Sequence, residues 1–357
     1  MIKTTALSAD QYPYLFNACR IPRDVRDQMV SHPGSRHVVV ARSNRFYFFD
    51  AIDESGNVHS PADIEAQLEK IIEIDNNNKD PAPPVGLFTA EQRDEWAKIY
   101  KVLEADPTNQ QTLHKIQSAT MMLCLDNVAP ESLHEISKLL LHSDAKNRWF
   151  DKQIQLIVFN NGKAGYNYEH ARIDGLTTIR HTNYTFEESQ KLAMGTRSPQ
   201  LPTPGKLKWV MNSQLQNYLV SSEKNVNALI ANNETDSIEF RAFGAKQLKT
   251  LKLSPDSFVQ VAFQLAYYRL NGKLAATYES ASTKEFLNGR TEVVRSVTSA
   301  ALDFCQAMER NSNKTVCRCT TTPPPFRGFR ISSFFEPCSS RRGRICCTRP
   351  WPPTIRT

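Results

Sequence analysis

The chain has 357 residues, 40% of them hydrophobic and 23% charged, which is ordinary for a globular protein long enough to bury a core. No apolar run approaches the ~18 residues that span a bilayer, and the first ten residues lack the apolar segment of a secretory signal, so we expect an intracellular protein. The formal charge of +7 lies wholly in residues 317–357, which contain eight arginines and one acidic residue, Glu336. The rest of the chain has equal numbers of basic and acidic residues and does not indicate a nucleic-acid partner.

Cysteine usage indicates a reducing compartment. The first 316 residues contain only Cys19, Cys124 and Cys305, which are too few and too dispersed for a disulfide framework. Histidine and cysteine spacings match no metal site, and the chain has no phosphate-binding loop, dinucleotide fingerprint or nucleophilic serine elbow. We therefore expect no metal and no resident cofactor.

Strands and helices are predicted to alternate through the first part of the chain. Residues 37–42 and 45–50 predict a hairpin of two apolar strands around a Ser-Asn turn. Ser60 and Pro61 predict the start of a helix that runs to about residue 73, because a hydroxyl cap precedes proline at the first helical position. Two further helices are predicted at residues 90–104 and 130–141.

The clearest hairpin signal lies at residues 154–159 and 163–170. The Asn-Gly pair between them suits a turn in which both central residues have positive φ. The second strand ends at His170, and a strand end that runs into a loop is a common place for a catalytic base.

The proline-rich residues 201–205 predict a connection between two domains. A long helix is expected at residues 212–231, and another starts at Ser254, which proline and an acid follow, with Phe258, Val261 and Leu265 on its core face. A final helix is predicted at residues 291–309. The chain therefore divides into an α/β domain over residues 1–205, an incomplete second domain over 206–310, and a tail over 311–357.

Three constellations could carry chemistry. In the first, the imidazole of His170 accepts a proton from a hydroxyl or thiol, Asp174 holds its orientation or stabilises the imidazolium, and Arg148 neutralises Asp174. The plain alternative is that His170 is a loop histidine whose hydrogen bonds are satisfied.

The second constellation places Lys246, Lys249 and Lys252 at intervals of three before the helix that Ser254 and Asp256 open. Compact ammonium groups suit a flexible polyanion such as the phosphates of coenzyme A, although a solvated basic loop has the same pattern.

The third constellation is a cluster of hydroxyls that includes Tyr278, Ser280 and Thr291. Hydroxyl donors near a helix N-terminus could hold a small carboxylate, although capping and turn formation use the same residues.

Six strings, taken in order over residues 10–310, resemble the carnitine/choline acyltransferase family. They are residues 147–152 (NRWFDK), 168–175 (YEHARIDG), 253–260 (LSPDSFVQ), 264–270 (QLAYYRL), 276–282 (ATYESAS) and 289–292 (GRTE). The resemblance implies two similar α/β domains of the chloramphenicol-acetyltransferase type, each a mixed sheet with flanking helices, and a monomer with the active site in a tunnel between its domains.

The resemblance also implies a reaction without metal, in which an acyl group moves between coenzyme A, a substrate, and the hydroxyl of carnitine. His170 matches the general base, and Asp174 matches a carboxylate that pairs with the arginine matching Arg148. Carnitine binding is implied for Tyr278, Ser280 and Thr291, and coenzyme A binding for Lys246, Lys249, Lys252, Ser254 and Asp256.

The chain departs from the family pattern in several places. Ala245 stands where the family usually has lysine, so Lys246 is displaced by one position, and Val293 replaces a second threonine. The family's serine-threonine-serine motif, carnitine-binding arginine and acyl-pocket wall have no match in residues 311–357, and the N-terminal helices of the family have no match before Met1. An abrupt rise in arginine, proline and cysteine in this tail suggests out-of-frame or intronic translation, with a disordered basic tail as the alternative.

The sequence therefore predicts a truncated carnitine O-acyltransferase for short or medium acyl chains, inactive as the literal chain. The family implies a mitochondrial or peroxisomal location, with the cytoplasm as the alternative. A non-catalytic fragment and a choline O-acetyltransferase are the alternatives. Thr291 favours carnitine, because choline-specific members usually replace the matching threonine. Apolar stripes on the helices of the incomplete domain are expected to stay exposed.

Overall fold

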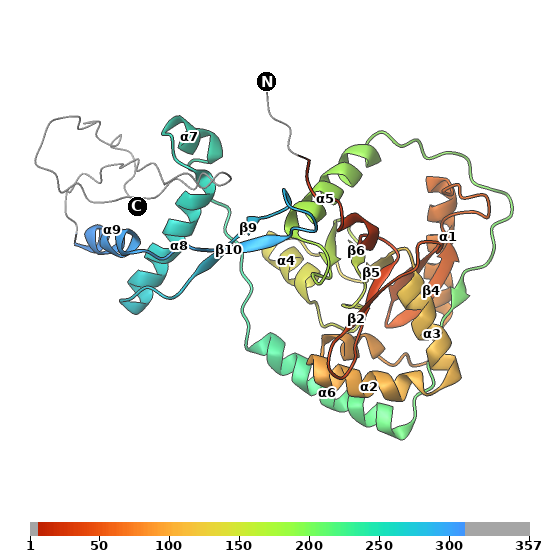
Figure 1. Cartoon of the computed structure of the whole chain (residues 1–357). Helices are drawn as coiled ribbons and strands as arrows, with labels where there is room; N and C mark the ends of the chain where they lie inside the picture. Colours follow the sequence, from red (N-terminus) through yellow and green to blue (C-terminus); the bar gives the residue numbers. More distant parts are fainter. Residues whose placement is uncertain (1–5, 311–357) are drawn as a thin grey trace, which may run out of the picture. The chain divides into compact units, whose positions relative to one another are not determined.

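The computed structural model of the chain describes residues 6–310 (Figure 1). Its internal contacts divide these residues into two compact units. The first unit is Ser8–Ile238, and the second runs from Glu239 onward and takes in Ala6 and Leu7. Among the described helices, none combines the length and the apolar character that crossing a membrane requires. The predicted tail, with its proposed origin, lies outside the described residues.

A six-stranded mixed sheet forms the centre of the first unit, in the order β7-β6-β5-β3-β4-β8. Strands β6, β5 and β3 are parallel to one another, whereas β4, β7 and β8 run antiparallel to their neighbours. This confirms the predicted α/β class with a mixed sheet and flanking helices. The strands are β3 (His37–Arg42), β4 (Arg45–Asp50), β5 (Met122–Asp126), β6 (Ile154–Phe159), β7 (Ala164–Tyr168) and β8 (Gly205–Lys206), and β1 (Ala18–Ile21) and β2 (Gln28–Ser31) form a separate hairpin.

Both predicted hairpins are confirmed, but their turns differ. Ser43 and Asn44 both have positive φ, 50° and 63°, in the tight turn between β3 and β4. Between β6 and β7 only Gly162 does, at 78°, so the expectation of two such residues there is wrong. This connection is two residues longer, and a single left-handed glycine suffices to reverse the chain.

Helices cover both faces of the sheet (Figure 1). The four predicted helices of this unit are present, whereas α3, α5 and the strand β5 were not predicted. Their bounds are α1 (Pro61–Asn77), α2 (Arg93–Glu104), α3 (Pro107–Ser118), α4 (Leu133–Leu141), α5 (Gly175–Ser189) and α6 (Ser213–Ala231), with short 3-10 turns η1 (Tyr12–Tyr14) and η2 (Val85–Ala90).

The alternation of side chains along the strands supplies two hydrophobic cores. Val40 and Tyr47 pack against Ile71 of α1 on one face. On the other face, Val39 and Ala41 lie with residues of α2, α3 and the aromatic cluster around a fully buried Trp149. Trp149 stacks on Trp209 with ring centroids 6.0 Å apart, and it meets Phe46 and Trp96 edge to face. The two faces are therefore closed by different helices.

The second unit contains α7 (Ala245–Thr250), α8 (Pro255–Asn271), β9 (Tyr278–Ser282), β10 (Thr291–Arg295) and α9 (Ser299–Glu309). The cap at Ser254 and the left-handed stop at Gly272 are confirmed. The predicted single helix over residues 291–309 is wrong, because its first part pairs with β9 as a strand. β-branched Val293 and Val294 favour that pairing over a helix.

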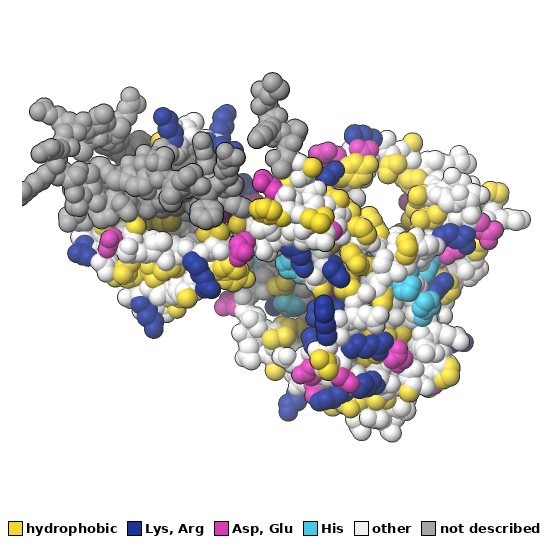
Figure 2. All heavy atoms as spheres, in the orientation of Figure 1, with side chains coloured by type: hydrophobic (Ala, Val, Ile, Leu, Met, Phe, Trp, Pro, Cys, Tyr) yellow, Lys and Arg dark blue, Asp and Glu magenta, His cyan; other side chains and the backbone are white. Residues whose placement is uncertain are grey.

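Within residues 239–310, few side chains of the second unit are buried. Cys305 is fully buried, but the predicted core face of α8, with Phe258, Val261 and Leu265, is only half-buried. Phe263 and Leu270 of α8 are 64% and 85% exposed, and apolar side chains are visible on the surface of this unit in Figure 2. The stripe that was expected to stay exposed is thus half-buried, and the exposed apolar side chains Phe263 and Leu270 lie outside it.

The predicted domain boundary at residue 205 stays a prediction. In this structure β8 pairs with β4, and α6 packs on α2 and η2, so residues 206–238 belong by contact to the first unit.

Replacing Gly86 by alanine is expected to destabilise the fold by roughly 1–3 kcal/mol. A Cβ at this position would fall on the backbone carbonyl oxygens of Lys146 and Arg148, which cannot move without disturbing the buried segment that follows. Urea unfolding should show the loss, whereas Gly34→Ala, where a Cβ meets nothing within 4 Å, should leave the midpoint unchanged. Equal midpoints for the two variants would contradict this account.

Candidate active site at His170

His170 follows β7 by two residues and is held in one tautomer. Its Nδ1 lies 2.7 Å from the backbone carbonyl oxygen of Ile173. Because a carbonyl oxygen only accepts hydrogen bonds, Nδ1 carries the proton, and the lone pair of the neutral ring lies on Nε2. The side chain is 77% exposed. This is the tautomer that a general base needs.

Asp174 lies beside the imidazole, as predicted. Its Oδ1 is 3.9 Å from Nδ1 of His170, and its side chain is 10% exposed. Oδ2 accepts a 2.6 Å hydrogen bond from Nε2 of Gln11, a fully buried side chain at the start of the first unit. A carboxylate this close to the ring can hold the orientation of the imidazole.

The predicted pairing of Arg148 with Asp174 is wrong. Arg148 is fully buried, and its two terminal nitrogens donate to both carboxylate oxygens of Asp126 at 2.8 and 2.7 Å. Their remaining protons go to the carbonyls of Asn147 and Leu139. Because Asp126 ends β5 beside this segment, the arginine neutralises the nearest buried acid and ties the sheet to α4.

Glu169 fixes the backbone on both sides of His170. Its Oε2 accepts a 2.8 Å hydrogen bond from the backbone N–H of Ala171, and its Oε1 accepts from Arg20 of β1 at 3.1 Å. The side-chain amide of Gln153 donates to the carbonyl of Glu169 at 2.5 Å. The histidine therefore projects from a loop that is anchored to β1 and to the start of β6.

Ion pairs extend from Arg20 into the core. Asp27 accepts from Arg20 and Arg93 at 2.6 and 2.7 Å, and Arg93 in turn pairs with Asp151 at 2.6 Å. Burial raises the pKa of Asp151 to about 6, although Arg93 and the indole N–H of Trp96 oppose the shift. The chain of charges links the His170 loop to the buried segment of residues 147–152.

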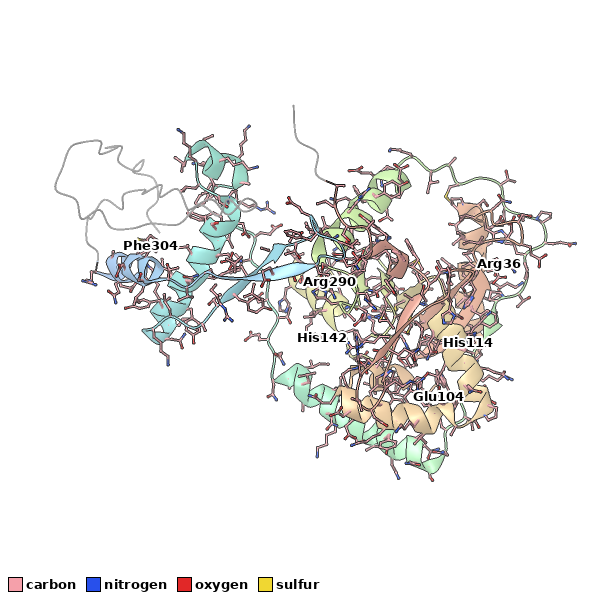
Figure 3. The ribbon with its side chains drawn as sticks, in the orientation of Figure 1. Arg36, Glu104, His114, His142, Arg290 and Phe304 are labelled. Atoms are coloured by element: carbon pink, nitrogen blue, oxygen red, sulfur yellow. The ribbon has the colours of Figure 1, made fainter. Side chains whose placement is uncertain are left out.

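The hairpin β1–β2 is tied to α2 by charges as well. Arg23 pairs with Glu104 at 3.1 Å, and Figure 3 shows Glu104 at the end of α2. Arg23 also lies over the ring of Tyr100, 5.3 Å from its centroid. These contacts stiffen the strand that carries Arg20.

A pocket of about 360 Å³ opens beside the histidine. Leucines of α4 and two tyrosines of β7 form its apolar part, and Tyr168 donates or accepts hydrogen bonds with His181 at 2.8 Å and Thr182 at 2.9 Å. Burial raises the pKa of Tyr168 to about 12, so the phenol stays neutral. The residues that line the pocket are Leu140, Leu141, Tyr166, Asn167, Tyr168, Glu169, His170, Ile173, Asp174, Gly175 and Thr178.

The predicted carnitine residues lie together on one hairpin of the second unit. Tyr278 and Ser280 are two residues apart on β9 and so share a face of the strand. Thr291 of β10 pairs with Ser282, which puts it on that same face and diagonal to Ser280. All three side chains are exposed.

The predicted coenzyme A residues lie on α7 and the start of α8. Lys246 and Lys249 are exposed on α7, which forms where a loop was expected, and Lys252 follows in a left-handed conformation with φ 58°. The hydroxyl of Ser254 accepts a hydrogen bond from the backbone N–H of Ser257, and Asp256 lies in the first turn of α8. Within residues 6–310, no group of three or more histidine, cysteine, aspartate or glutamate side chains could hold a metal ion.

The chain belongs to the choline/carnitine o-acyltransferase family, whose sequence profile matches residues 1–321. It is similar to mitochondrial carnitine O-palmitoyltransferase 2 of Mus musculus, with 36% identity over 88% of this chain and 48% of that protein. Choline O-acetyltransferase of Sus scrofa is 34% identical over 85% of this chain and 50% of that protein. The chain therefore spans about half the length of the curated relatives it matches. The family match confirms the resemblance seen in the sequence.

Two parts of the site were not predicted. Asp126, the partner of Arg148, was discoverable in principle as an acid that ends an apolar run, since the end of a buried strand is where an acid needs a partner. Nothing in the sequence around Gln11 indicated a contact with Asp174, because the two are 163 positions apart and only the fold brings them together.

Removing Arg148 with Arg148→Met is expected to cost about 3–5 kcal/mol of stability, because it leaves the Asp126 carboxylate buried without its partner. A double-mutant cycle with Asp126→Leu should give a coupling energy above about 1 kcal/mol, whereas the cycle with Asp174→Leu should give a value near zero. A coupling energy between Arg148 and Asp174 that exceeds the one between Arg148 and Asp126 would contradict the pairing seen in this structure.

The free energy of unfolding is expected to rise with pH between about 8 and 10.5 because of Lys152. Burial lowers the pKa of this lysine from 10.5 to about 8, and its ammonium donates to the carbonyls of Gln117 and Ala119. The unfolded chain binds this proton more tightly, so the folded state gains about 3 kcal/mol as the lysine is neutralised in both states. Unfolding profiles at several pH values should show the rise in the wild type and its absence in Lys152→Met. Parallel pH profiles of unfolding free energy for the wild type and Lys152→Met would contradict this role of Lys152.

Proposed function

We propose that the protein is a carnitine O-acyltransferase, which moves an acyl group between coenzyme A and the hydroxyl of carnitine with His170 as the general base. The carrying observation is the hydrogen bond from Nδ1 of His170 to the carbonyl of Ile173, which leaves the lone pair on Nε2. Asp174 supports the charge that the ring acquires.

The proposed reaction begins when Nε2 takes the proton of the carnitine hydroxyl while its oxygen attacks the thioester carbonyl of acyl-CoA. The tetrahedral intermediate then collapses, the carbon–sulfur bond breaks, and the coenzyme A sulfur leaves with the proton from Nε2. In the reverse direction the same nitrogen takes the proton of the coenzyme A thiol. No net proton is consumed, and the histidine returns to its starting tautomer.

Substrate roles are proposed for the second unit. The shared face of Tyr278, Ser280 and Thr291 offers three hydroxyls for the carnitine carboxylate. The exposed lysines of α7 and the loop after it suit the phosphates of coenzyme A. We propose a short- or medium-chain acyl group and a mitochondrial or peroxisomal location, and the palmitoyltransferase relatives make a long chain the competing expectation.

Choline is the competing acceptor, because a choline O-acetyltransferase is among the relatives. Thr291 supports carnitine, since its hydroxyl can donate to a carboxylate that choline lacks. A fragment without activity is the other alternative, because the chain spans about half of its relatives.

Replacing His170 by alanine is expected to lower the rate of coenzyme A release about 100-fold or more, because the proton of the acceptor hydroxyl loses its acceptor. The assay follows thiol release from acetyl-, octanoyl- and palmitoyl-CoA with L-carnitine or choline. His134→Ala, an exposed histidine of α4, is the matched control and should keep the wild-type rate.

Equal rates for His170→Ala and the wild type would overturn the role of His170. Absence of turnover in the wild type would favour the fragment without activity, and turnover with choline alone would favour the choline acetyltransferase.

A further inference from the structure

Asp174 occupies a helix cap without acting as one. It stands at the N-cap of α5 with extended backbone, φ −115° and ψ 164°, yet its side chain accepts no capping hydrogen bond from the first turn. Aspartate is among the residues best suited to this task. In the described part of the chain, N-cap side chains do accept such bonds at Ser60, Asp106, Ser132, Asn212, Ser254 and Thr298.

The Asp174 carboxylate bonds to Gln11 instead of capping the helix. Its Nε2 donates to Oδ2 of Asp174 at 2.6 Å, and its Oε1 accepts from Oγ1 of Thr177 at 2.6 Å. Oε1 also accepts from the backbone N–H of Asp174 at 3.0 Å. Two donors meet Oε1 and a carboxylate meets Nε2, so the amide has only one orientation that satisfies its neighbours.

The backbone hydrogen bond of Gln11 reaches His170 through a single peptide group. The N–H of Asp174 and the carbonyl of Ile173 belong to the same peptide unit. That carbonyl accepts from Nδ1 of His170, and that N–H donates to Gln11. Each bond in such a chain polarises the next, so the acceptor that sets the tautomer of His170 is itself oriented and strengthened by Gln11.

We propose that Gln11 is a positioning residue for the general base. Through one peptide group and through the Asp174 carboxylate, it holds His170 as the Nδ1–H tautomer with its lone pair on Nε2. The inference rests on the proposed function of His170. It assigns a part in the chemistry to Gln11, the residue directly before η1.

Gln11→Met is expected to lower kcat about tenfold to a hundredfold while both KM values change less than about twofold, because substrate contacts stay in place. The ¹⁵N NMR signals of His170 in the full chain should shift toward the Nε2–H tautomer. Gln67→Met is the matched control: this buried glutamine of α1 donates to the carbonyl of Pro202, and its loss should change neither measurement.

Gln11→Glu separates positioning from packing. It keeps the two acceptor bonds of the side chain but sets a second carboxylate against Asp174, and the pair can share a proton only at acidic pH. Its rate should therefore fall relative to wild type as pH rises, a change of profile that a packing role would not produce.

A folded Gln11→Met variant with the wild-type tautomer of His170 would overturn the proposal, whatever its rate. If the wild type shows no turnover but Gln11→Met still shifts the tautomer, the function proposed above fails for this chain and the positioning role of Gln11 stands.

Discussion

Burial of charge in residues 147–152 is the constraint on which the first unit depends. This segment drives a guanidinium, a carboxylate and an ammonium into the interior, where each needs a partner of its own. Arg148 donates to the carboxylate of Asp126 at the end of β5. The carboxylate of Asp151 accepts from Arg93 and Trp96 of α2, and the ammonium of Lys152 donates to the carbonyl of Gln117 at the end of α3. The central strand and two helices are thereby held in register with the segment that packs Trp149 into the core.

Two sets of contacts order the loop of His170, and one of them starts from that constraint. Through Arg93, Asp27 and Arg20, the buried charges reach Glu169, which clamps the backbone around the histidine. From the opposite direction, Gln11 orients the peptide group that accepts the proton of the ring. An exposed imidazole thus acquires a defined tautomer without being buried.

The two units differ in how much of their apolar surface is covered. The first has a sheet with helices on both faces, whereas the described part of the second has one two-stranded hairpin and a helix α8 with exposed apolar side chains such as Phe263 and Leu270. Side chains proposed for carnitine and coenzyme A lie in this second unit, on β9, β10, α7 and α8. Their roles depend on hydroxyls and lysines at the surface, which need little burial to act.

Local signals in the sequence determined the hairpins, the capped helices and the class of the fold. Ser43-Asn44, Ser60-Pro61 and Ser254-Pro255 act within a few residues, and the strings around His170 carry the family. Only the tertiary structure decided which charges pair. Arg148 was expected to neutralise Asp174, but Asp126 lies closer, because the register of β5 is set by strand pairing rather than by sequence neighbours. Gln11 meets Asp174 across 163 residues, and no local pattern reports a contact that chain folding alone creates.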